Sequence, residues 1–354
     1  MSNVIFACSA ERGYIRNRVL ARALRRSHNV RVIGSNNRRY PLRLANVIPR
    51  VLASGRYDYH FAGFLGQPLV PFMWARRMRP LILDAFVSVY DTLVLDRGQH
   101  NRNSPIGRVT RWLDSWSMRH AHLVLTDTPA AAAFMASEFA ADPAKLVAVP
   151  VGADESVFSP RDRTGETGVT TVLYVSSYLP LHGVPTVIEA AHELRSDKNI
   201  RFVLVGKGPD RARVDAIARE LAVDNAQFID WVDFDDLPDL IASCDIFLGG
   251  HFSHGNEKAQ RVVPGKVFQG LAMQRPVILG DCEANREWFS DGETARIVPM
   301  ADPAALAAAI SELAADPTAR KRIAEAGRAQ YEKHFSEAAI AAILDQNMAR
   351  LHAH

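Results

Sequence analysis

The amino-acid sequence predicts an α/β protein made of two doubly wound domains, each with a parallel sheet covered by helices on both faces. Short β-branched or apolar runs alternate with longer helical patterns, and this alternation occurs in both halves of the chain. A polar stretch near the middle, residues 159–168, carries one proline and two glycines and predicts a linker. At 354 residues the chain is also long for a single domain.

The first half has an irregular but recognisable alternation. Strands are expected over residues 3–8, 30–34, 57–63, 80–84 and 123–126. Helices are expected over residues 15–26 and 109–119. The segment before the linker therefore predicts one domain over residues 1–160.

The second half alternates more regularly. Strands are expected over residues 171–175, 201–205, 226–229, 246–249, 276–279 and 295–298. Helices are expected over residues 184–195, 211–221, 237–243, 267–273 and 303–315. These elements predict a second domain over residues 161–335, followed by a C-terminal helix within 336–354 that packs back on the first domain. Ligands of such sheets bind at the carboxyl ends of the strands.

The composition is that of an ordinary globular protein, with 48% hydrophobic and 23% charged residues. No apolar run approaches the ~20 residues of a membrane-spanning helix, and the first residues predict a strand rather than a secretion signal. Cys8, Cys244 and Cys282 are widely spaced and odd in number, so we expect reduced thiols in a cytoplasmic protein rather than disulfides or a zinc site.

The positive charge is concentrated at the start of the chain. Residues 1–60 contain twelve arginines, no lysine and two acidic residues. Such a region can face nucleic acid, an anionic membrane or a phosphorylated acceptor, or it can be a solvated basic face. Nucleic acid is not expected, because interleaved aromatic residues and a docking motif are missing. If the acceptor is lipid-linked, residues 42–52 with Arg43 and Arg50 are expected to dock on the inner face of a membrane; core packing is the alternative for these leucines.

A cluster of cations follows the strand expected at 246–249. A loop carries His254, Lys258, Arg261 and Lys266, and a helix is expected to begin near Lys266. Three cations beside a helix N-terminus make a diphosphate site, because the unpaired N–H groups and the helix dipole favour negative charge there. Gln269, one turn into the helix, can hydrogen-bond a ribose or sugar hydroxyl. A cationic surface loop is the alternative.

Residues 258–266 read Lys-Ala-Gln-Arg-Val-Val-Pro-Gly-Lys. Here the sequence resembles the retaining glycosyltransferases of family 4, and especially a subset associated with surface-polysaccharide assembly. That family has the GT-B fold, two Rossmann-like domains facing across a cleft. The resemblance covers nearly the whole chain, although Arg261 and Gln269 stand where the family has two glutamates. It implies that Lys258, Arg261, Lys266 and Gln269 bind the donor.

A second match covers residues 174–183, Tyr-Val-Ser-Ser-Tyr-Leu-Pro-Leu-His-Gly. The family usually has arginine and lysine where this chain has Ser177 and His182, and the resemblance implies that both lie near the donor diphosphate. The cations named above can supply the missing charge. A Gly-x-Gly turn ending at Gly208 resembles the family's loop beside the donor, and Trp231 is expected to line the nucleobase.

Three aspartates, Asp233, Asp235 and Asp236, could suggest a metal site. They precede a predicted helix, where acidic residues act as caps, and the family type needs no metal-carboxylate motif. We therefore expect no metal and no cofactor beyond the donor substrate.

In the first half, Gly13, Tyr14 and Arg16 follow the first strand and begin a helix. Gly13 permits a tight turn and close backbone approach, so this segment is expected to line the interdomain cleft near the acceptor. A purely structural turn is the alternative.

The strand expected at 80–84 ends in Asp84, and an acid at such an edge is costly unless it has a role or a partner. The family often has a histidine at the matching place, which is thought to hold the transferring sugar or the acceptor. We therefore predict that Asp84 is catalytic together with Lys266, with Ser88 and Asp91 beside it. Each of these could instead cap the following helix.

The resemblance thus implies a metal-independent, hexosyltransferase-type glycosyltransferase. It would move a sugar from a nucleoside-diphosphate donor to a sugar, lipid-linked or small-molecule acceptor, with retention, in polysaccharide or glycoconjugate assembly. Two alternatives stay open. Ser177, His182 and Gln269, which replace charged family residues, are compatible with a non-catalytic pseudo-glycosyltransferase that binds nucleotide or a partner. A nucleotide-sugar epimerase would need paired acids and bases, which the sequence supplies poorly.

Overall fold

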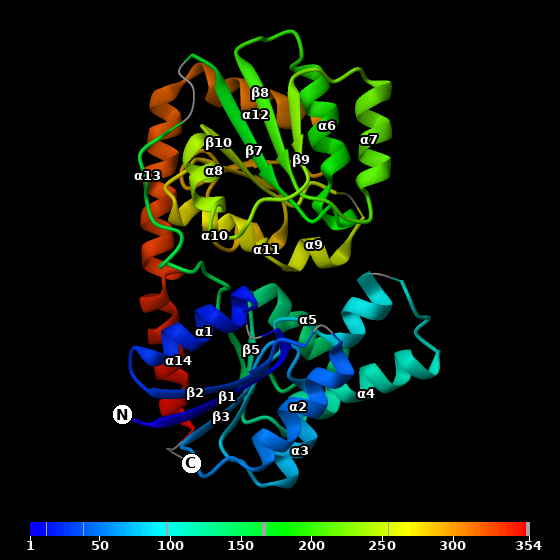
Figure 1. Ribbon diagram of the computed structural model, residues 1–354, viewed down its shortest axis with the longest axis vertical. Coiled ribbons are helices and arrows are strands. Elements are labelled where there is room, and N and C mark those ends of the chain that lie inside the picture. Colours follow the sequence, from blue (N-terminus) through cyan, green and yellow to red (C-terminus); the bar gives the residue numbers. More distant parts are fainter. Residues whose placement is uncertain (12, 38, 97, 165–167, 254, 352–354) are drawn as a thin grey trace. The chain divides into compact units, whose positions relative to one another are not determined.

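The computed structural model describes residues 1–354 except 12, 38, 97, 165–167, 254 and 352–354. The chain forms two compact units (Figure 1). Unit 1 comprises Met1–Gly152 and Ser336–His354, and unit 2 comprises Ala153–Phe335. Each unit contains one six-stranded sheet whose neighbouring strands run parallel. The predicted α/β class, with two doubly wound units, is confirmed.

The sheet of unit 1 has the order β2-β1-β3-β4-β5-β6. Its strands are β1 (Asn3–Glu11), β2 (Asn29–Ser35), β3 (Tyr59–Ala62), β4 (Leu81–Asp84), β5 (Leu123–Thr126) and β6 (Leu146–Ala148). Every residue of β3, β4 and β5 is buried. This is why these strands are recognisable as short apolar runs: a parallel sheet covered on both faces exposes neither side of its central strands.

The helices of unit 1 cover both faces of this sheet. They are α1 (Ile15–Arg25), α2 (Tyr40–Leu52), α3 (Val70–Ala75), α4 (Pro105–His120), α5 (Pro129–Phe139) and α14 (Glu337–Arg350), with shorter turns η1 (Gln67–Leu69), η2 (Asp91–Asp96) and η3 (Pro143–Lys145). The last helix, α14, lies against α1 (red and blue in Figure 1). There Arg22 Nε donates to Glu337 at 2.6 Å, and Leu20 and Leu344 share a buried cluster.

Helix α2 is the segment predicted to dock on a membrane. Its Val47 and Val51 are buried in the core of unit 1, and buried Arg43 donates to the carbonyl of Asn37 at 3.0 Å. One large apolar side chain of α2, that of Leu42, is exposed. Core packing therefore accounts for most of the apolar residues of 42–52.

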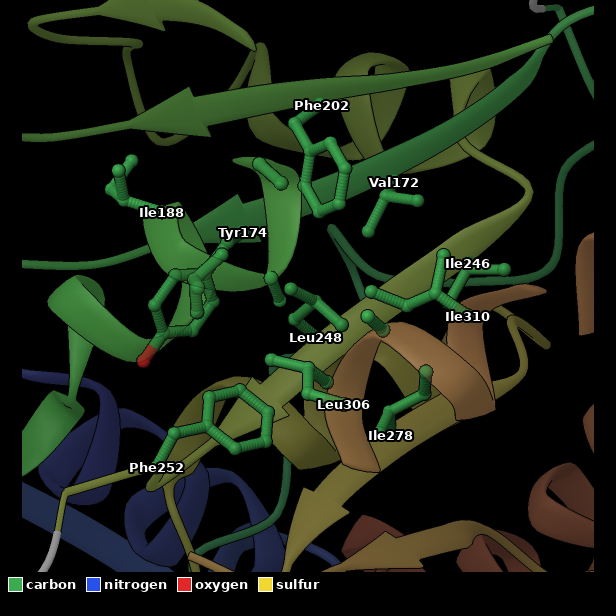
Figure 2. Close-up of a cluster of buried hydrophobic side chains, with 14 of the residues drawn as sticks. Val172, Tyr174, Ile188, Phe202, Ile246, Leu248, Phe252, Ile278, Leu306 and Ile310 are labelled. Atoms are coloured by element: carbon green, nitrogen blue, oxygen red, sulfur yellow. The ribbon is translucent and has the colours of Figure 1, made fainter. Parts of the chain in front are cut away.

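The sheet of unit 2 has the order β12-β11-β10-β7-β8-β9. Its strands are β7 (Thr170–Val175), β8 (Ile200–Val205), β9 (Ala226–Ile229), β10 (Ile246–Gly250), β11 (Val277–Gly280) and β12 (Arg296–Val298). Its helices are η4 (Pro180–His182), α6 (Val184–Glu193), α7 (Arg211–Glu220), α8 (Leu237–Ser243), α9 (Glu257–Arg261), α10 (Gly265–Ala272), α11 (Glu283–Arg286), α12 (Pro303–Ala315) and α13 (Pro317–His334). Figure 2 shows Val172, Tyr174 and Leu248 of the sheet in one apolar cluster with Leu306 and Ile310 of α12.

The division between the units falls after Gly152, whereas the sequence predicts it after residue 160. Fully buried Phe158 meets Phe234 edge-to-face, with ring centroids 5.3 Å apart. Glu155 accepts a hydrogen bond from the Tyr331 hydroxyl at 3.2 Å. Residues 153–158 are therefore held by unit 2, and the polar stretch that follows them is not the division.

Two further features bear on the sequence-based expectations. In the part of the chain that the structure describes, no helix is at once long and apolar enough to cross a membrane. Cys8, Cys244 and Cys282 are buried, and none of them forms a disulfide with another described residue.

Candidate functional site

The carboxyl ends of β7 and β10, which are neighbours in the sheet, bring two loops of unit 2 together. The carbonyl of His182 accepts hydrogen bonds from the Tyr174 hydroxyl at 2.6 Å and from the backbone N–H of Phe252 at 3.3 Å. Gly183 has φ +65°, and a Cβ there would lie 2.3 Å from the carbonyl carbon of Phe252. Glycine is required at this close approach, so the turn that carries His182 has a fixed position against the loop after β10.

Two histidines stack in this corner. The rings of His182 and His251 are 5.6 Å apart and 7° from parallel, and Ser176 Oγ lies 2.8 Å from His182 Nδ1. Burial is the largest cause that lowers the pKa of both imidazoles, and the charge of Lys266 is the next. The pKa of His251 falls to about 3. Both rings are therefore neutral near pH 7 and offer hydrogen bonds rather than charge.

Lys266 supplies the charge. Its Nζ is buried and has no hydrogen-bond partner among the described residues, and it lies 4.4 Å from the ring centre of Tyr174. Burial lowers its pKa to about 7. Lys266 sits in the first turn of α10, whose N-cap residue, Pro264, makes no side-chain cap hydrogen bond. A buried ammonium in the first turn of a helix suits an anion, because the helix dipole also favours negative charge there.

The segment before α10 was predicted to be a loop, but part of it is helical. Helix α9 begins after Asn256, whose side chain accepts from the Ala259 N–H at 3.1 Å. Lys258 and Arg261 are three residues apart on α9 and so share a side of it. The charge of Lys258 also lowers the pKa of His251, which shows that this predicted cation lies near the histidine stack.

The structure gathers part of the predicted set. Lys258, Lys266 and His182 lie around His251. Gln269 is half-buried one turn further along α10. His254, which the sequence places in the same segment, lies outside the described residues.

A second close approach joins the loops after β7 and β8. A Cβ on Gly208 would lie 1.9 Å from the carbonyl oxygen of Ser177, and one on Gly206 would lie 1.8 Å from that of Ser176. Ser177 and Gly208 are both exposed. The predicted Gly-x-Gly turn is therefore needed by the fold itself, and it leaves backbone groups of both loops at one surface.

The predicted nucleobase residue, Trp231, is 69% exposed, and its Nε1–H donates to Asp233 at 2.9 Å. Asp236 is the N-cap residue of α8 but makes no side-chain cap hydrogen bond. Arg211, which the sequence analysis did not single out, donates to Asp230 at 2.6 Å and to the Gly206 carbonyl at 3.2 Å. Within the described ranges, no group of three or more His, Cys, Asp or Glu side chains could hold a metal ion.

In unit 1, Asp84 has a partner, which is one of the two explanations that the sequence offers for an acid at this edge. Its side chain and that of Arg16 are fully buried, with Arg16 Nη2 3.0 Å and Nε 3.2 Å from the carboxylate. Arg16 also donates to the carbonyls of Val149 at 2.6 Å and Pro150 at 2.8 Å. Asp84 ends β4 as expected, and its buried ion pair with Arg16 holds α1 against the sheet.

Ser88 and Asp91 are likewise buried. Ser88 Oγ donates to Asp114 at 2.8 Å and accepts from the Asp91 N–H at 2.9 Å. Burial raises the pKa of Asp114 to about 6, despite hydrogen bonds from Ser88 and the backbone of Tyr90 and Val89. Ser88 therefore caps the start of η2, which is the structural alternative considered for it.

Gly13 and Tyr14 are exposed. The Tyr14 ring stacks on Phe64 with centroids 4.1 Å apart. A side chain on Gly13 would meet no atom within 4 Å, so no close approach within the described residues requires a glycine there.

Comparison with known proteins shows what the chain is similar to. Residues 169–316, most of unit 2, match the family model of the group 1 glycosyl transferases. A curated relative, the MMP alpha-(1->4)-mannosyltransferase of Mycolicibacterium hassiacum, is 27% identical over 221 residues, which are 62% of this chain and 52% of the relative. The alpha-D-kanosaminyltransferase of Streptomyces kanamyceticus is 25% identical over 77% of this chain and 68% of its own length. The matched region thus spans about half the length of the mannosyltransferase.

A solved structure agrees on the fold. The crystal structure of Anabaena Alr3699/HepE in complex with UDP and glucose superposes with a TM-score of 0.74 over 99% of this chain and 100% of that one, at 14% identity. At that identity the likeness concerns the fold alone. The chain has the GT-B fold of two Rossmann-like units, and its residues 169–316 match the group 1 glycosyl transferases.

Proposed function

We propose that this protein is a glycosyltransferase that takes a sugar from a nucleoside-diphosphate donor bound by unit 2 and passes it, with retention, to an acceptor hydroxyl. The observation that carries the proposal is the Lys266 ammonium. It is buried, it lacks a hydrogen-bond partner among the described residues, and it stands at the uncapped start of α10. A buried cation of this kind is costly in the free protein, and a diphosphate would supply the missing partner.

Each neighbour of Lys266 has a part in this scheme. As the bond between sugar and diphosphate breaks, negative charge grows on the departing phosphate. Cations that are already in position stabilise that charge without further reorganisation. Lys266 would hold the diphosphate, with Lys258 and Arg261 of α9 as further cations. The neutral imidazoles of His182 and His251 would add hydrogen bonds, and Ser177 a neutral contact beside Gly208.

The nucleotide part of the donor would lie along the loops after β8 and β9. Gly208 lets its loop pack closely on Ser177, which leaves backbone groups of both loops at one surface, and exposed Trp231 offers an aromatic face. Gln269, half-buried on α10, would bond ribose or sugar hydroxyls. The complex of a fold relative with UDP and glucose supports a nucleotide donor. The alpha linkage in the names of two relatives supports retention.

The acceptor is proposed to be a sugar, a lipid-linked molecule or a small hydroxyl compound received by unit 1. The positive charge of residues 1–60 supports an acceptor site on unit 1 only in part, because several of its arginines already have partners within the unit. Arg16 and Arg22 are paired with carboxylates, while Arg43 and Arg50 donate to backbone carbonyls. A role in polysaccharide or glycoconjugate assembly at the cytoplasmic face of a membrane is part of the same proposal.

The test is release of nucleoside diphosphate and transfer of labelled sugar by the purified chain, with a panel of UDP- and GDP-sugars and acceptors. Lys266→Ala should lower turnover at least ~100-fold, the scale measured when one transition-state donor is lost. The matched control is Lys198→Ala, because that lysine is 75% exposed. Nucleotide binding without transfer across the panel would favour a pseudo-glycosyltransferase. Interconversion of the donor sugar without acceptor would favour an epimerase.

A further inference from the structure

Helix α4 of unit 1 buries mainly small and polar residues and exposes apolar ones, which is the reverse of a helix that only covers a core. The residues it buries are Gly107, Thr110, Asp114, Ser117 and Met118. Its apolar residues Ile106, Val109 and Trp112 are 45%, 61% and 59% exposed. A surface helix normally turns its apolar stripe inward, so folding of unit 1 does not account for this outward one.

The exposed stripe continues as a row of aromatic rings. Trp112 lies 6.1 Å from Trp116, and Trp116 lies 5.7 Å from Trp74 of α3, measured between ring centroids. Trp116 also stacks on His120 at 4.0 Å. Trp74 is 40% exposed. We call Val109, Trp112, Trp116 and Trp74 the α4 face.

The charges around the α4 face are positive. Arg108, Arg111 and Arg119 are exposed on the same helix. The single acidic residue of α4, Asp114, points into the unit, where it accepts from Ser88 and Tyr90. Arg111 is paired with Glu138, with 3.0 Å between Nε and the carboxylate. Arg108 and Arg119 are therefore the cations beside the apolar stripe that have no ion pair with another described residue.

Two open hollows adjoin the N-terminal half of α4. Their volumes are about 430 and 620 Å³, and both are lined by Asn103, Arg108 and Trp112. Their linings mix aromatic, basic and amide groups. Such hollows can take the glycerol and phosphate parts of a lipid headgroup while Trp112 and Val109 reach the acyl region.

We propose that the α4 face docks unit 1 on an anionic lipid bilayer. Indole rings and arginine side chains each combine an apolar body with a polar tip, and both are suited to the boundary between headgroups and acyl chains. The apolar stripe buries itself at this boundary, and Arg108 and Arg119 attract anionic headgroups. This surface differs from α2, whose apolar residues mostly pack in the core. It does not depend on the proposed sugar transfer.

The experiment is co-sedimentation of the full chain with vesicles of phosphatidylcholine alone or with about a third phosphatidylglycerol. We expect binding to the anionic vesicles that weakens as salt rises, with quenching of tryptophan fluorescence by brominated lipid. Val109→Ser with Trp112→Ala should weaken partitioning about tenfold or more. Arg108→Gln with Arg119→Gln should remove the preference for anionic vesicles.

Leu42→Ser is the matched control, since Leu42 is 48% exposed on α2 of the same unit. It should leave partitioning unchanged, and all variants should keep the wild-type unfolding transition because the altered side chains are exposed. The proposal is overturned if the wild-type chain ignores anionic vesicles, or if Val109→Ser with Trp112→Ala binds them equally well. It is also overturned if the α4 face instead supports a dimer in solution that this double variant abolishes.

Discussion

The Lys266 ammonium lies 4.4 Å from the centre of the Tyr174 ring, and the hydroxyl of that tyrosine donates to the His182 carbonyl at 2.6 Å. The Tyr174 side chain of β7 therefore places its ring beside the cation, and its hydroxyl fixes the turn that carries His182. An aromatic face attracts a desolvated cation by about 2 kcal/mol or more, but it adds no negative charge. The ammonium stays able to pair with an anion.

Lys266→Met should raise the stability of the free protein while it weakens ligand binding. Methionine keeps the apolar stem and removes the desolvated charge, so the free energy of unfolding in urea should rise by about 1–2 kcal/mol. Affinity for UDP or GDP, measured by calorimetry, should fall about 100-fold, because the ligand loses a buried charge partner. Lys198→Met should change neither quantity. A less stable Lys266→Met with unchanged affinity would contradict the assignment.

The free protein should become more stable as pH rises from about 7 towards 10. Burial lowers the pKa of Lys266 to about 7 from its ordinary 10.5. In that window the unfolded chain holds a proton that the folded chain has released, so raising the pH favours the folded state. The measurement is the free energy of unfolding in urea across this pH range. In Lys266→Met, the part of its rise with pH that comes from Lys266 should be absent.

Nucleotide binding near pH 8 should take up about one proton, because a bound diphosphate raises the pKa of Lys266 again. Calorimetry in two buffers of different ionisation enthalpy measures this uptake. His182 and His251 should not contribute, since the pKa of each is lowered and both rings stay neutral. Equal uptake by wild type and Lys266→Met would count against Lys266 as the group that titrates.

Much of the fold could be predicted from the sequence because parallel strands buried on both faces are continuous apolar runs. Strands β5 and β9 match their predicted residues, and α8 and α12 match theirs. The division between units was missed because Phe158 is one aromatic residue in a polar stretch, and its partner, Phe234, lies far along the chain. No local pattern records such a contact.

The candidate site shows the same limit. Lys258 and Lys266 could be predicted because cations near the start of a helix are visible in sequence. Tyr174 looks like any apolar strand residue, and His251 follows a strand as an isolated histidine, so neither stood out. The partner of Asp84 could not be named from the sequence, because Arg16 is 68 residues away and only the folded sheet joins them.

Gly208→Ala should destabilise the protein by about 2–4 kcal/mol, because the new Cβ would lie 1.9 Å from the Ser177 carbonyl oxygen and must displace backbone. The displaced loop should also weaken nucleotide binding. Gly55→Ala is the control, since a Cβ there meets no atom within 4 Å. Thermal unfolding and calorimetry check both effects, and equal stability of the two variants would contradict the close approach.

The buried pair of Arg16 and Asp84 should behave as a structural unit. Arg16→Met or Asp84→Leu alone leaves one charge buried without its partner, so each should cost about 3–5 kcal/mol. The double variant should recover most of this loss. Recovery should stay incomplete by about 1–3 kcal/mol, since the carbonyls of Val149 and Pro150 also lose the guanidinium donor. Urea unfolding of the wild type, the two single variants and the double variant, combined in a double-mutant cycle, measures these free-energy differences.

The same double variant separates a structural role of Asp84 from the catalytic role predicted from sequence. If the carboxylate acts only by holding Arg16, the double variant should transfer sugar at a rate within about tenfold of wild type once its stability is restored, because no group that touches substrate has changed. A stable, nucleotide-binding double variant that transfers no sugar would show that Asp84 also serves the reaction. Nucleotide affinity is the control, since Lys266 and its neighbours in unit 2 remain intact in this variant.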